Sequence, residues 1–264
     1  MPPRHHKGPE NAAGHAVAVN GVDHGRRRLL AGAAAFASLT LAPGVMLMAA
    51  GPAGARPPGV AASSKVRWGI LIDVSKCPDG CDICVTACKK ENGWSAREGS
   101  TTDVQWIRTV NLKDKKTGAT QSLPMMCQHC ENPPCVDVCP TGSSFKRADG
   151  IVLVDKHTCI GCRYCMLACP YGARSFVHED VSGQKPHAPR GKGTVESCTM
   201  CVHRVDAGNT PACVVACNKA ENRSMIFGDL NDPKSEIAKA VGRHLVTRVR
   251  ADLGLDQGIL YRGL

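Results

Sequence analysis

The sequence predicts an α+β fold built from tandem βαβ-type units, in which short strands lead into cysteine-rich loops and helical turns. Three observations support this prediction. The 264 residues include 16 cysteines, and these fall into four groups of four. Short β-branched segments precede two of the groups. Aromatic residues make up only 4% of the chain, which predicts a thin apolar core that metal–thiolate bonds would reinforce. Short hairpins, long loops and a C-terminal helix complete the expected architecture.

The third cysteine group has the spacing C-x2-C-x2-C-x3-C-P, which is that of a bacterial ferredoxin segment. In such a segment three closely spaced thiolates bind one cubane cluster, and the fourth reaches a different cluster. One such run therefore requires a partner run. The four quartets are Cys77, Cys81, Cys84 and Cys88; Cys127, Cys130, Cys135 and Cys139; Cys159, Cys162, Cys165 and Cys169; and Cys198, Cys201, Cys213 and Cys217.

Two alternatives to iron–sulfur clusters are zinc sites and disulfides. An even number of cysteines in an exported chain often indicates disulfides. Zinc sites usually combine two C-x2-C pairs across a longer loop, and only the fourth quartet resembles that pattern. All four quartets end in C-x3-C, which favours clusters. The first quartet has three residues rather than two between Cys77 and Cys81, which leaves the geometry of its loop open.

The strands are predicted from β-branched runs and turn residues. Residues 70–73 and 152–155 are similar runs, each four residues before a cysteine, and residues 66–74 form the expected first strand. Residues 104–112 and 120–123 predict a hairpin with a charged tip, and residues 145–155 predict a second one. Met225 to Phe227 is one further expected strand.

Two segments after the third quartet have different expected structures. Residues 179–196 are rich in Gly, Pro, Lys and His, which predicts an irregular surface loop. Residues 233–253 carry Ile237, Val241, Leu245 and Val249 at four-residue intervals, which predicts a helix that Gly254 ends. Its apolar stripe is expected to pack on the protein's own core, with docking of a partner as the alternative.

The N-terminal part has the features of an export signal. Arg26 and Arg27 precede a weakly apolar run, and residues 53–55 provide an A-x-A cleavage site. A retained transmembrane anchor is the alternative, because the run is long enough to span a bilayer. We therefore expect a twin-arginine signal peptide in residues 1–55, a linker in 56–64, a four-cluster domain in 65–230, and a C-terminal helix and tail in 231–264.

The net charge of +10 does not indicate a nucleic-acid-binding protein. Residues 1–55 contain five Lys and Arg and two Asp and Glu, which leaves 28 basic and 21 acidic residues, or +7, in the rest of the chain. Four oxidised cubanes with their thiolates would contribute about −8, so the loaded protein would be nearly neutral. The basic excess is therefore interpreted as compensation for buried clusters.

The quartet order, the spacings and the leader resemble the four-cluster ferredoxin-like subunits that pair with molybdopterin oxidoreductases and with NrfD-type quinone-interacting membrane proteins. The resemblance covers nearly all of the chain after residue 65. Residues 127–135, 145–150, 198–205 and 227–233 resemble most the DsrO family, the periplasmic iron–sulfur subunits of the sulfite-reductase-associated DsrMKJOP complex.

The resemblance implies crossed ligation, in which the second and third quartets exchange their fourth ligands and the first and fourth do the same. Consistently, Cys139 and Cys169 are followed by proline, whereas Cys88 and Cys217 are not. The implied ligand sets of four 4Fe–4S clusters are Cys77, Cys81, Cys84 with Cys217; Cys88 with Cys198, Cys201, Cys213; Cys127, Cys130, Cys135 with Cys169; and Cys139 with Cys159, Cys162, Cys165. His129 and His203 lie inside quartets and are expected not to be ligands.

No residue pattern indicates a nucleophile with its base, a metal-bound water or a phosphate-binding loop, so we expect electron relay rather than bond chemistry. Two functions remain open. The first is a relay subunit of a periplasm-facing membrane complex, held there by an NrfD-type quinone-interacting subunit and passing electrons to a multihaem cytochrome c or another redox subunit. The second is the electron-transfer subunit of a molybdopterin reductase, of polysulfide or nitrite type, or of a hydrogenase.

Overall fold

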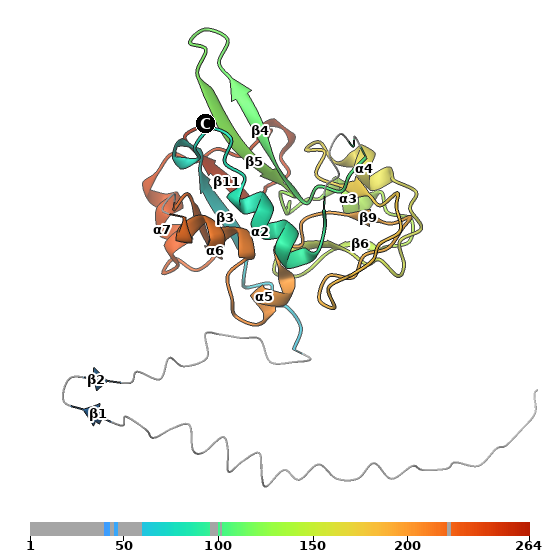
Figure 1. The fold of residues 1–264 in the computed structure, drawn as a ribbon, viewed down its shortest axis with the longest axis horizontal. Helices are drawn as coiled ribbons and strands as arrows, with labels where there is room; N and C mark the ends of the chain where they lie inside the picture. The colour runs from blue at the N-terminus through green and yellow to red at the C-terminus, as the bar shows by residue number, and fades with distance from the viewer. Residues whose placement is uncertain (1–39, 43–44, 47–59, 96–99, 101, 221–222) are drawn as a thin grey trace, which may run out of the picture. The chain divides into compact units, whose positions relative to one another are not determined.

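The structure, a computed structural model, describes residues 40–42, 45–46, 60–95, 100, 102–220 and 223–264 (Figure 1). Two compact units divide the chain, Met1–Gly51 and Pro52–Leu264. In the first unit, strands β1 (Thr40–Ala42) and β2 (Val45–Met46) pair in antiparallel fashion. The twin arginines and the A-x-A site of the expected signal peptide lie outside the described residues. All sixteen cysteines belong to the second unit.

A three-stranded sheet forms one side of the second unit. Its central strand is β3 (Trp68–Asp73), which confirms the predicted first strand. Strand β10 (Met225–Asp229) pairs with β3 in antiparallel register, and β11 (Ile259–Arg262) pairs with it in parallel register. The apolar face of β3 is buried, with Ile72 fully inaccessible to solvent. After β3 a short 3-10 helix, η2 (Val74–Lys76), leads into the first cysteine loop.

Two helices from distant parts of the sequence pack against each other beside this sheet. They are α2 (Ile83–Asn92) and α6 (Ala212–Lys219), which lie side by side in Figure 1. Helix α2 ends at Gly93, whose positive φ of 69° is a backbone conformation that glycine adopts without strain. A short helix, α5 (Val202–Asp206), follows the first two cysteines of the fourth quartet. Cys84 and Cys88 lie on α2, and Cys213 and Cys217 lie on α6.

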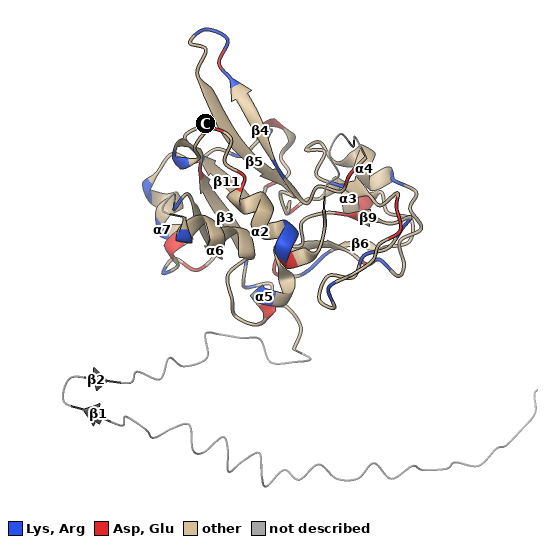
Figure 2. Cartoon of the chain, viewed as in Figure 1, with Lys and Arg blue, Asp and Glu red and all other residues tan. Residues whose placement is uncertain are grey.

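Two hairpins occur where the sequence predicts them. Strands β4 (Ile107–Lys113) and β5 (Thr120–Met126) pair along their whole length and project from the unit (Figure 1). The tip of this hairpin carries basic residues, coloured blue in Figure 2. Strands β6 (Ser144–Lys146) and β7 (Val152–Val154) form the second hairpin.

A second group of short elements carries the second and third quartets. Helix α3 (Pro134–Asp137) packs on α4 (Tyr164–Ala168), and a short pair of strands, β8 (Ser175–Phe176) and β9 (Val195–Glu196), lies nearby. Arg67 joins this group to the three-stranded sheet, because its guanidinium donates to the carbonyls of His129 at 2.7 Å and Gly150 at 3.0 Å. The predicted α+β architecture is thus observed as two helix pairs connected through short strands.

The predicted C-terminal helix is too long. The observed helix α7 (Glu236–Arg243) begins after Ser235, whose side chain accepts a hydrogen bond from the Ala238 amide, and the chain is extended at His244. Leu245 is 92% exposed, and a 3-10 turn, η3 (Ala251–Leu253), precedes β11. The helix buries Ile237 against Leu71 and Leu260 of the sheet, so its stripe packs on the protein's own core. Residues 231–264 therefore belong to the same compact unit as the cysteines.

The segment 179–196 also departs from its prediction as a surface loop. Its last part is buried, since Val195 and Glu196 form β9 and Glu196 has no exposed surface. Arg190 and Trp106 both bond the Glu196 carboxylate, at 3.1 Å and 3.0 Å. A charged residue can be buried in this way when its oxygens are paired. Among the residues that the structure describes, no helix combines the length and the hydropathy needed to cross a membrane.

Candidate cluster-binding sites

All sixteen cysteines carry free thiols, and the structure gathers them into four sets. Each set takes three cysteines from one quartet and one from another, so we name each set after the cysteine that comes from the other quartet. The members are Cys77, Cys81, Cys84 and Cys217 in the Cys217 set; Cys88, Cys198, Cys201 and Cys213 in the Cys88 set; Cys127, Cys130, Cys135 and Cys169 in the Cys169 set; and Cys139, Cys159, Cys162 and Cys165 in the Cys139 set.

The Cys217 set forms where α2 and α6 meet the end of β3. The Cys84 thiol is within electrostatic reach of the thiols of Cys81, Cys217 and Cys77, and burial raises the pKa of Cys84 to about 12. Ser224 lies between two members, with its Oγ 3.6 Å from the Sγ of Cys77 and 2.9 Å from that of Cys217. The hydroxyl is therefore positioned to donate to a thiolate of this set.

The Cys88 set lines a small cavity together with Trp106, Ile107 and Met126. Trp94 donates its indole N–H to the Sγ of Cys88 at 3.3 Å, and the amide nitrogen of Asn92 lies 3.5 Å from the same sulfur. Burial raises the pKa of Cys88 to about 12 even though these two donors lower it. Burial also raises the pKa of Cys198 and Cys213 well above the usual range. Ionised thiolates here require a positive partner, which the irons of a cluster supply.

The Cys169 set lines a second small cavity, next to α3. Burial raises the pKa of Cys127 and Cys130 to about 12. The buried guanidinium of Arg174 faces this cavity, and its Nη2 lies 3.1 Å from the Sγ of Cys135. A cationic donor thus contacts this set directly.

The Cys139 set lines a third small cavity, next to α4. The Cys139 sulfur lies 3.2 Å from the Ser143 hydroxyl and 3.3 Å from the Ser144 amide nitrogen, with Thr141 Oγ1 at 3.7 Å. Burial alone would raise the pKa of the Cys139 thiol. These hydrogen bonds outweigh that effect and lower the pKa to about 7. Cys162 is exposed, which makes this the set nearest to solvent.

These sites fit 4Fe–4S clusters in the chemistry of their donors. Three of the four sets each line a small cavity, as is expected if each holds the same group. Four thiols line each of them, and no carboxylate or imidazole does so. Such a cluster, when bound, accepts and releases one electron. The residues of this chain hold it, exclude water from it and donate hydrogen bonds to its sulfurs.

The two quartet histidines lie outside the three cavities. His129 is fully buried and accepts a hydrogen bond from the Val152 amide through its Nδ1 at 3.0 Å. Its burial lowers its pKa to about 3, so the imidazole is neutral. His203 is partly buried, and its Nε2 lies 2.8 Å from a Glu91 carboxylate oxygen.

Sequence reasoning did not identify the residues that donate to the thiols. Trp94, Ser143 and Ser224 lie four to seven residues beyond a cysteine, at separations that follow no common motif. Arg174 is one of 33 basic residues, and nothing in its sequence surroundings distinguishes it. Only the three-dimensional proximity to sulfur identifies them.

Comparison with known proteins agrees with this geometry. The profile of the 4Fe–4S dicluster domain family matches residues 119–230, which contain twelve of the sixteen cysteines. The Hdr-like menaquinol oxidoreductase iron–sulfur subunit 1 of Archaeoglobus fulgidus is 43% identical over 227 residues, covering 76% of this chain and 84% of that protein.

Two bacterial relatives match over a similar extent. The B subunit of tetrathionate reductase from Salmonella typhimurium is 38% identical over 204 residues, covering 76% of this chain and 74% of that protein. Protein NrfC of Escherichia coli is 36% identical over 213 residues, covering 80% of this chain and 87% of that protein. The chain therefore belongs to the family of 4Fe–4S iron–sulfur electron-transfer subunits of oxidoreductase complexes that includes these three proteins.

Proposed function

We propose that the protein holds four 4Fe–4S clusters, one on each of the four cysteine sets, and relays single electrons along them. The observation that carries this proposal is that the cysteines assemble across quartets rather than within them. Four complete sets with four thiols each favour 4Fe–4S clusters over 3Fe–4S centres. The absence of disulfides among the sixteen cysteines argues against the disulfide alternative.

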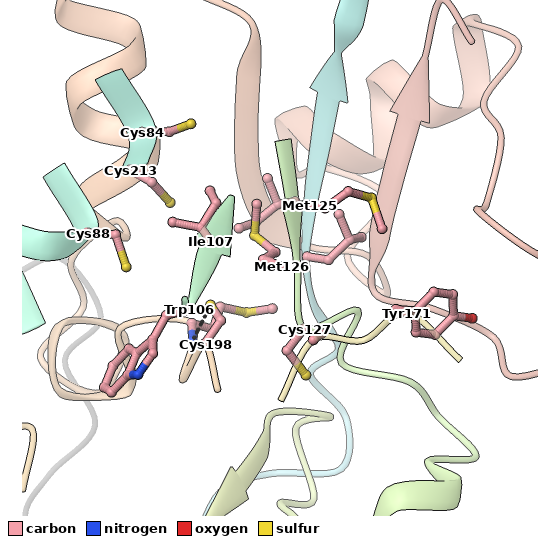
Figure 3. Packing of buried hydrophobic residues seen from close by; sticks show 14 of the residues in the cluster. Cys84, Cys88, Trp106, Ile107, Met125, Met126, Cys127, Tyr171, Cys198 and Cys213 are labelled. Atoms are coloured by element: carbon pink, nitrogen blue, oxygen red, sulfur yellow. Dashed lines mark hydrogen bonds between the residues drawn. The ribbon is translucent and has the colours of Figure 1, made fainter. Parts of the chain in front are cut away.

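The arrangement of the sets supports a continuous electron path. The thiol of Cys213 in the Cys88 set is within electrostatic reach of Cys84 in the Cys217 set. Cys135 of the Cys169 set and Cys165 of the Cys139 set are related in the same way. Figure 3 shows Ile107 and Met126 between Cys84, Cys88 and Cys213 on one side and Cys127 on the other. Electrons would therefore pass through the sets in the order Cys217, Cys88, Cys169 and Cys139, or in the reverse order.

We propose that the electrons come from or go to a quinone-interacting membrane protein of NrfD type. The name of the archaeal relative, which shares 43% identity, includes menaquinol oxidoreductase and supports a quinone partner. The resemblance to the DsrO family further favours a sulfur-metabolism complex with a multihaem cytochrome c. In this arrangement the chain is peripheral to the membrane and is held there by its partners.

A second candidate is the electron-transfer subunit of a molybdopterin reductase. It is favoured by the similarity to the B subunit of tetrathionate reductase and to the iron–sulfur B subunit of a putative dimethyl sulfoxide reductase, at 38% and 39% identity. The two candidates differ in the partner and not in the clusters. Gentle detergent extraction followed by affinity purification of the tagged chain distinguishes them. Recovery of an NrfD-type membrane protein and a haem protein supports the first, a stoichiometric molybdopterin subunit supports the second, and a partnerless monomer contradicts both.

We also propose that the chain is exported to the periplasm through the twin-arginine pathway. Arg26 and Arg27 before the apolar run support this proposal. Replacing both with lysine should leave the precursor in the cytoplasm, because ammonium does not substitute for the planar guanidinium. Normal periplasmic delivery of that variant would exclude this route. The mass of the mature N-terminus tests cleavage after Ala55 separately.

A further inference from the structure

Arg174 is a buried cation that lies between two cysteine sets. Its side chain is only 4% exposed and faces the cavity of the Cys169 set. The Nη2 atom donates to the Sγ of Cys135 in that set at 3.1 Å. The same guanidinium is within electrostatic reach of the thiol of Cys165, which belongs to the Cys139 set, and lowers the pKa of that thiol. One side chain therefore reaches sulfur ligands of two sets.

The other donors of Arg174 have no protein partner. Its Nε and Nη1 are fully buried and form no hydrogen bond in the described part of the chain. Leaving charged donors buried and unpaired costs several kcal/mol, so such groups normally find an acceptor. Two partly buried arginines do, since Arg147 pairs with Asp149 and Asp206, and Arg190 pairs with Glu196. Among the described ion pairs, Arg174 has no carboxylate partner.

The geometry predicts sulfur as the acceptor for these two donors of Arg174. The unpaired donors belong to a side chain that lines a cavity surrounded by thiols, where the sulfides and thiolates of a cluster offer several acceptors. A planar guanidinium has five N–H groups in a fixed fork, so it can donate in two directions at once. Lysine, with one compact ammonium, cannot span two clusters in this way.

We propose that Arg174 is a positioning residue that sets the reduction potentials of two clusters together, those on the Cys169 set and the Cys139 set. This inference rests on the proposed clusters. A cubane with four thiolates carries about −2 when oxidised and about −3 when reduced, and a buried positive charge next to it favours the more negative form. Arg174 thus raises both potentials. The described side chains that donate to the Cys88 sulfur, Trp94 and Asn92, are neutral.

The test is a redox titration of the purified, cluster-loaded protein, followed by electron paramagnetic resonance. In Arg174→Met the ratio of reduced to oxidised cluster at a fixed potential should fall at least tenfold for both clusters, which is 59 mV for one electron. Signals of the clusters on the Cys217 and Cys88 sets should not move. In Arg174→Lys this ratio should fall less, and by different amounts for the two clusters, because a single ammonium donates to only one of them.

Arg108→Met is the matched control. Arg108 donates to the backbone carbonyls of Tyr171 and Gly172, on the same loop, and bonds oxygen rather than sulfur. All four potentials should therefore remain unchanged in this variant. Fully loaded Arg174 variants with unshifted potentials would overturn the inference. Wild-type protein without 4Fe–4S signals would instead overturn the proposed function.

A second measurement needs no variant. Wild-type protein labelled with ¹⁵N only in the arginine guanidinium groups should show nitrogen hyperfine coupling to the reduced clusters in pulsed paramagnetic resonance. If the Arg174 variants lose clusters and the labelled wild type shows no such coupling, the residue has only a structural role and the inference is wrong.

Discussion

The two halves of the molecule hold their cysteine sets in different ways. In the α2–α6 half, which contains the Cys217 and Cys88 sets, helices of ten and eight residues carry the thiols and neutral side chains donate to them. In the α3–α4 half, which contains the Cys169 and Cys139 sets, the helices have four and five residues and a buried arginine faces the thiols. Proline follows the exchanged cysteine only in the second half.

This difference indicates that one ligand scheme can produce two electrostatic environments. Burial raises the pKa of Cys84 and Cys88 in the first half, and of Cys127 and Cys130 in the second, to about 12. The hydrogen bonds to Cys139 in the α3–α4 half instead bring the pKa of that thiol to about 7. Groups that stabilise a thiolate also stabilise the extra charge of a reduced cluster. We therefore expect higher reduction potentials in the α3–α4 half, where electrons would accumulate.

The largest expected effect is the loss of a whole cluster. In both halves, replacing the exchanged cysteine should remove the cluster held by the other quartet. Cys217→Ser should abolish the cluster on Cys77, Cys81 and Cys84 and spare the Cys88 set. Cys169→Ser should abolish the cluster on the Cys169 set and spare that on the Cys139 set. Paramagnetic resonance of the four reduced clusters measures this. Loss of the cluster nearest in sequence, in either variant, would show that ligation is local.

A glycine in each half provides the second comparison. Gly161 and Gly80 both precede a cysteine and have φ of 70° and 72°, so alanine costs about 1–2 kcal/mol at either position. At Gly161 the added Cβ would lie 2.1 Å from the Gly193 carbonyl oxygen, whereas at Gly80 it would meet nothing within 4 Å. Gly161→Ala should therefore lose the cluster on the Cys139 set, and Gly80→Ala should keep all clusters with slightly lower stability. The iron content and the unfolding rate of each purified variant test these expectations. Equal iron contents in the two variants would show that the contact between Gly161 and Gly193 does not matter for the cluster.

The buried histidine of the α3–α4 half should make stability depend on pH. The pKa of His129 is about 3 in the folded protein and about 6.5 in an unfolded chain, so below pH 6.5 the unfolded state binds more protons. Stability therefore falls as the pH drops from about 6.5 towards 3, by about 2 kcal/mol at pH 5. His129→Asn should remove this part of the dependence, because asparagine tolerates the positive φ of 43° at this position.

The measurement is the rate of unfolding in denaturant at pH 7 and pH 5, followed by the visible absorbance of the clusters. Replacement of the exposed His244 with asparagine is the control and should leave the difference between the two pH values unchanged. An equal loss of stability in wild type and His129→Asn would exclude His129 as the source.

The smallest expected effects come from single hydrogen bonds to sulfur. Ser143→Ala removes a donor from Cys139, and Trp94→Phe removes one from Cys88. Each loss should cost about 1 kcal/mol and so lower the reduction potential of its own cluster by about 40 mV. The reduction potentials of the other three clusters should not change. Redox titration measures both shifts. A shift of the wrong cluster would contradict the set assignments.

The sequence predicted the elements whose signals are local. The hairpin was predicted from the runs 104–112 and 120–123 and the charged turn between them, and the structure places it at residues 107–113 and 120–126. The cysteine spacings likewise predicted the four quartets, whereas the exchange of fourth ligands between quartets was implied by the resemblance to four-cluster subunits. The strand before each of the first and third quartets was found from the internal repeat.

The missed features depend on contacts between distant residues. Strand β11 is only four residues long, and its parallel partner β3 lies almost 190 residues earlier, so no local pattern indicates it. The predicted helix over residues 233–253 continued an apolar spacing that the fold interrupts after Arg243, in order to return the chain to β3. Arg174 is identifiable only from the position of the thiols around it, which the sequence does not encode locally.

The proposed function requires that each cysteine set binds one 4Fe–4S cluster. Iron and acid-labile sulfide analysis of anaerobically purified protein tests this most directly. Four clusters predict about 16 irons and about 16 sulfides per chain. About eight irons, or a strong zinc content in place of iron, would contradict it.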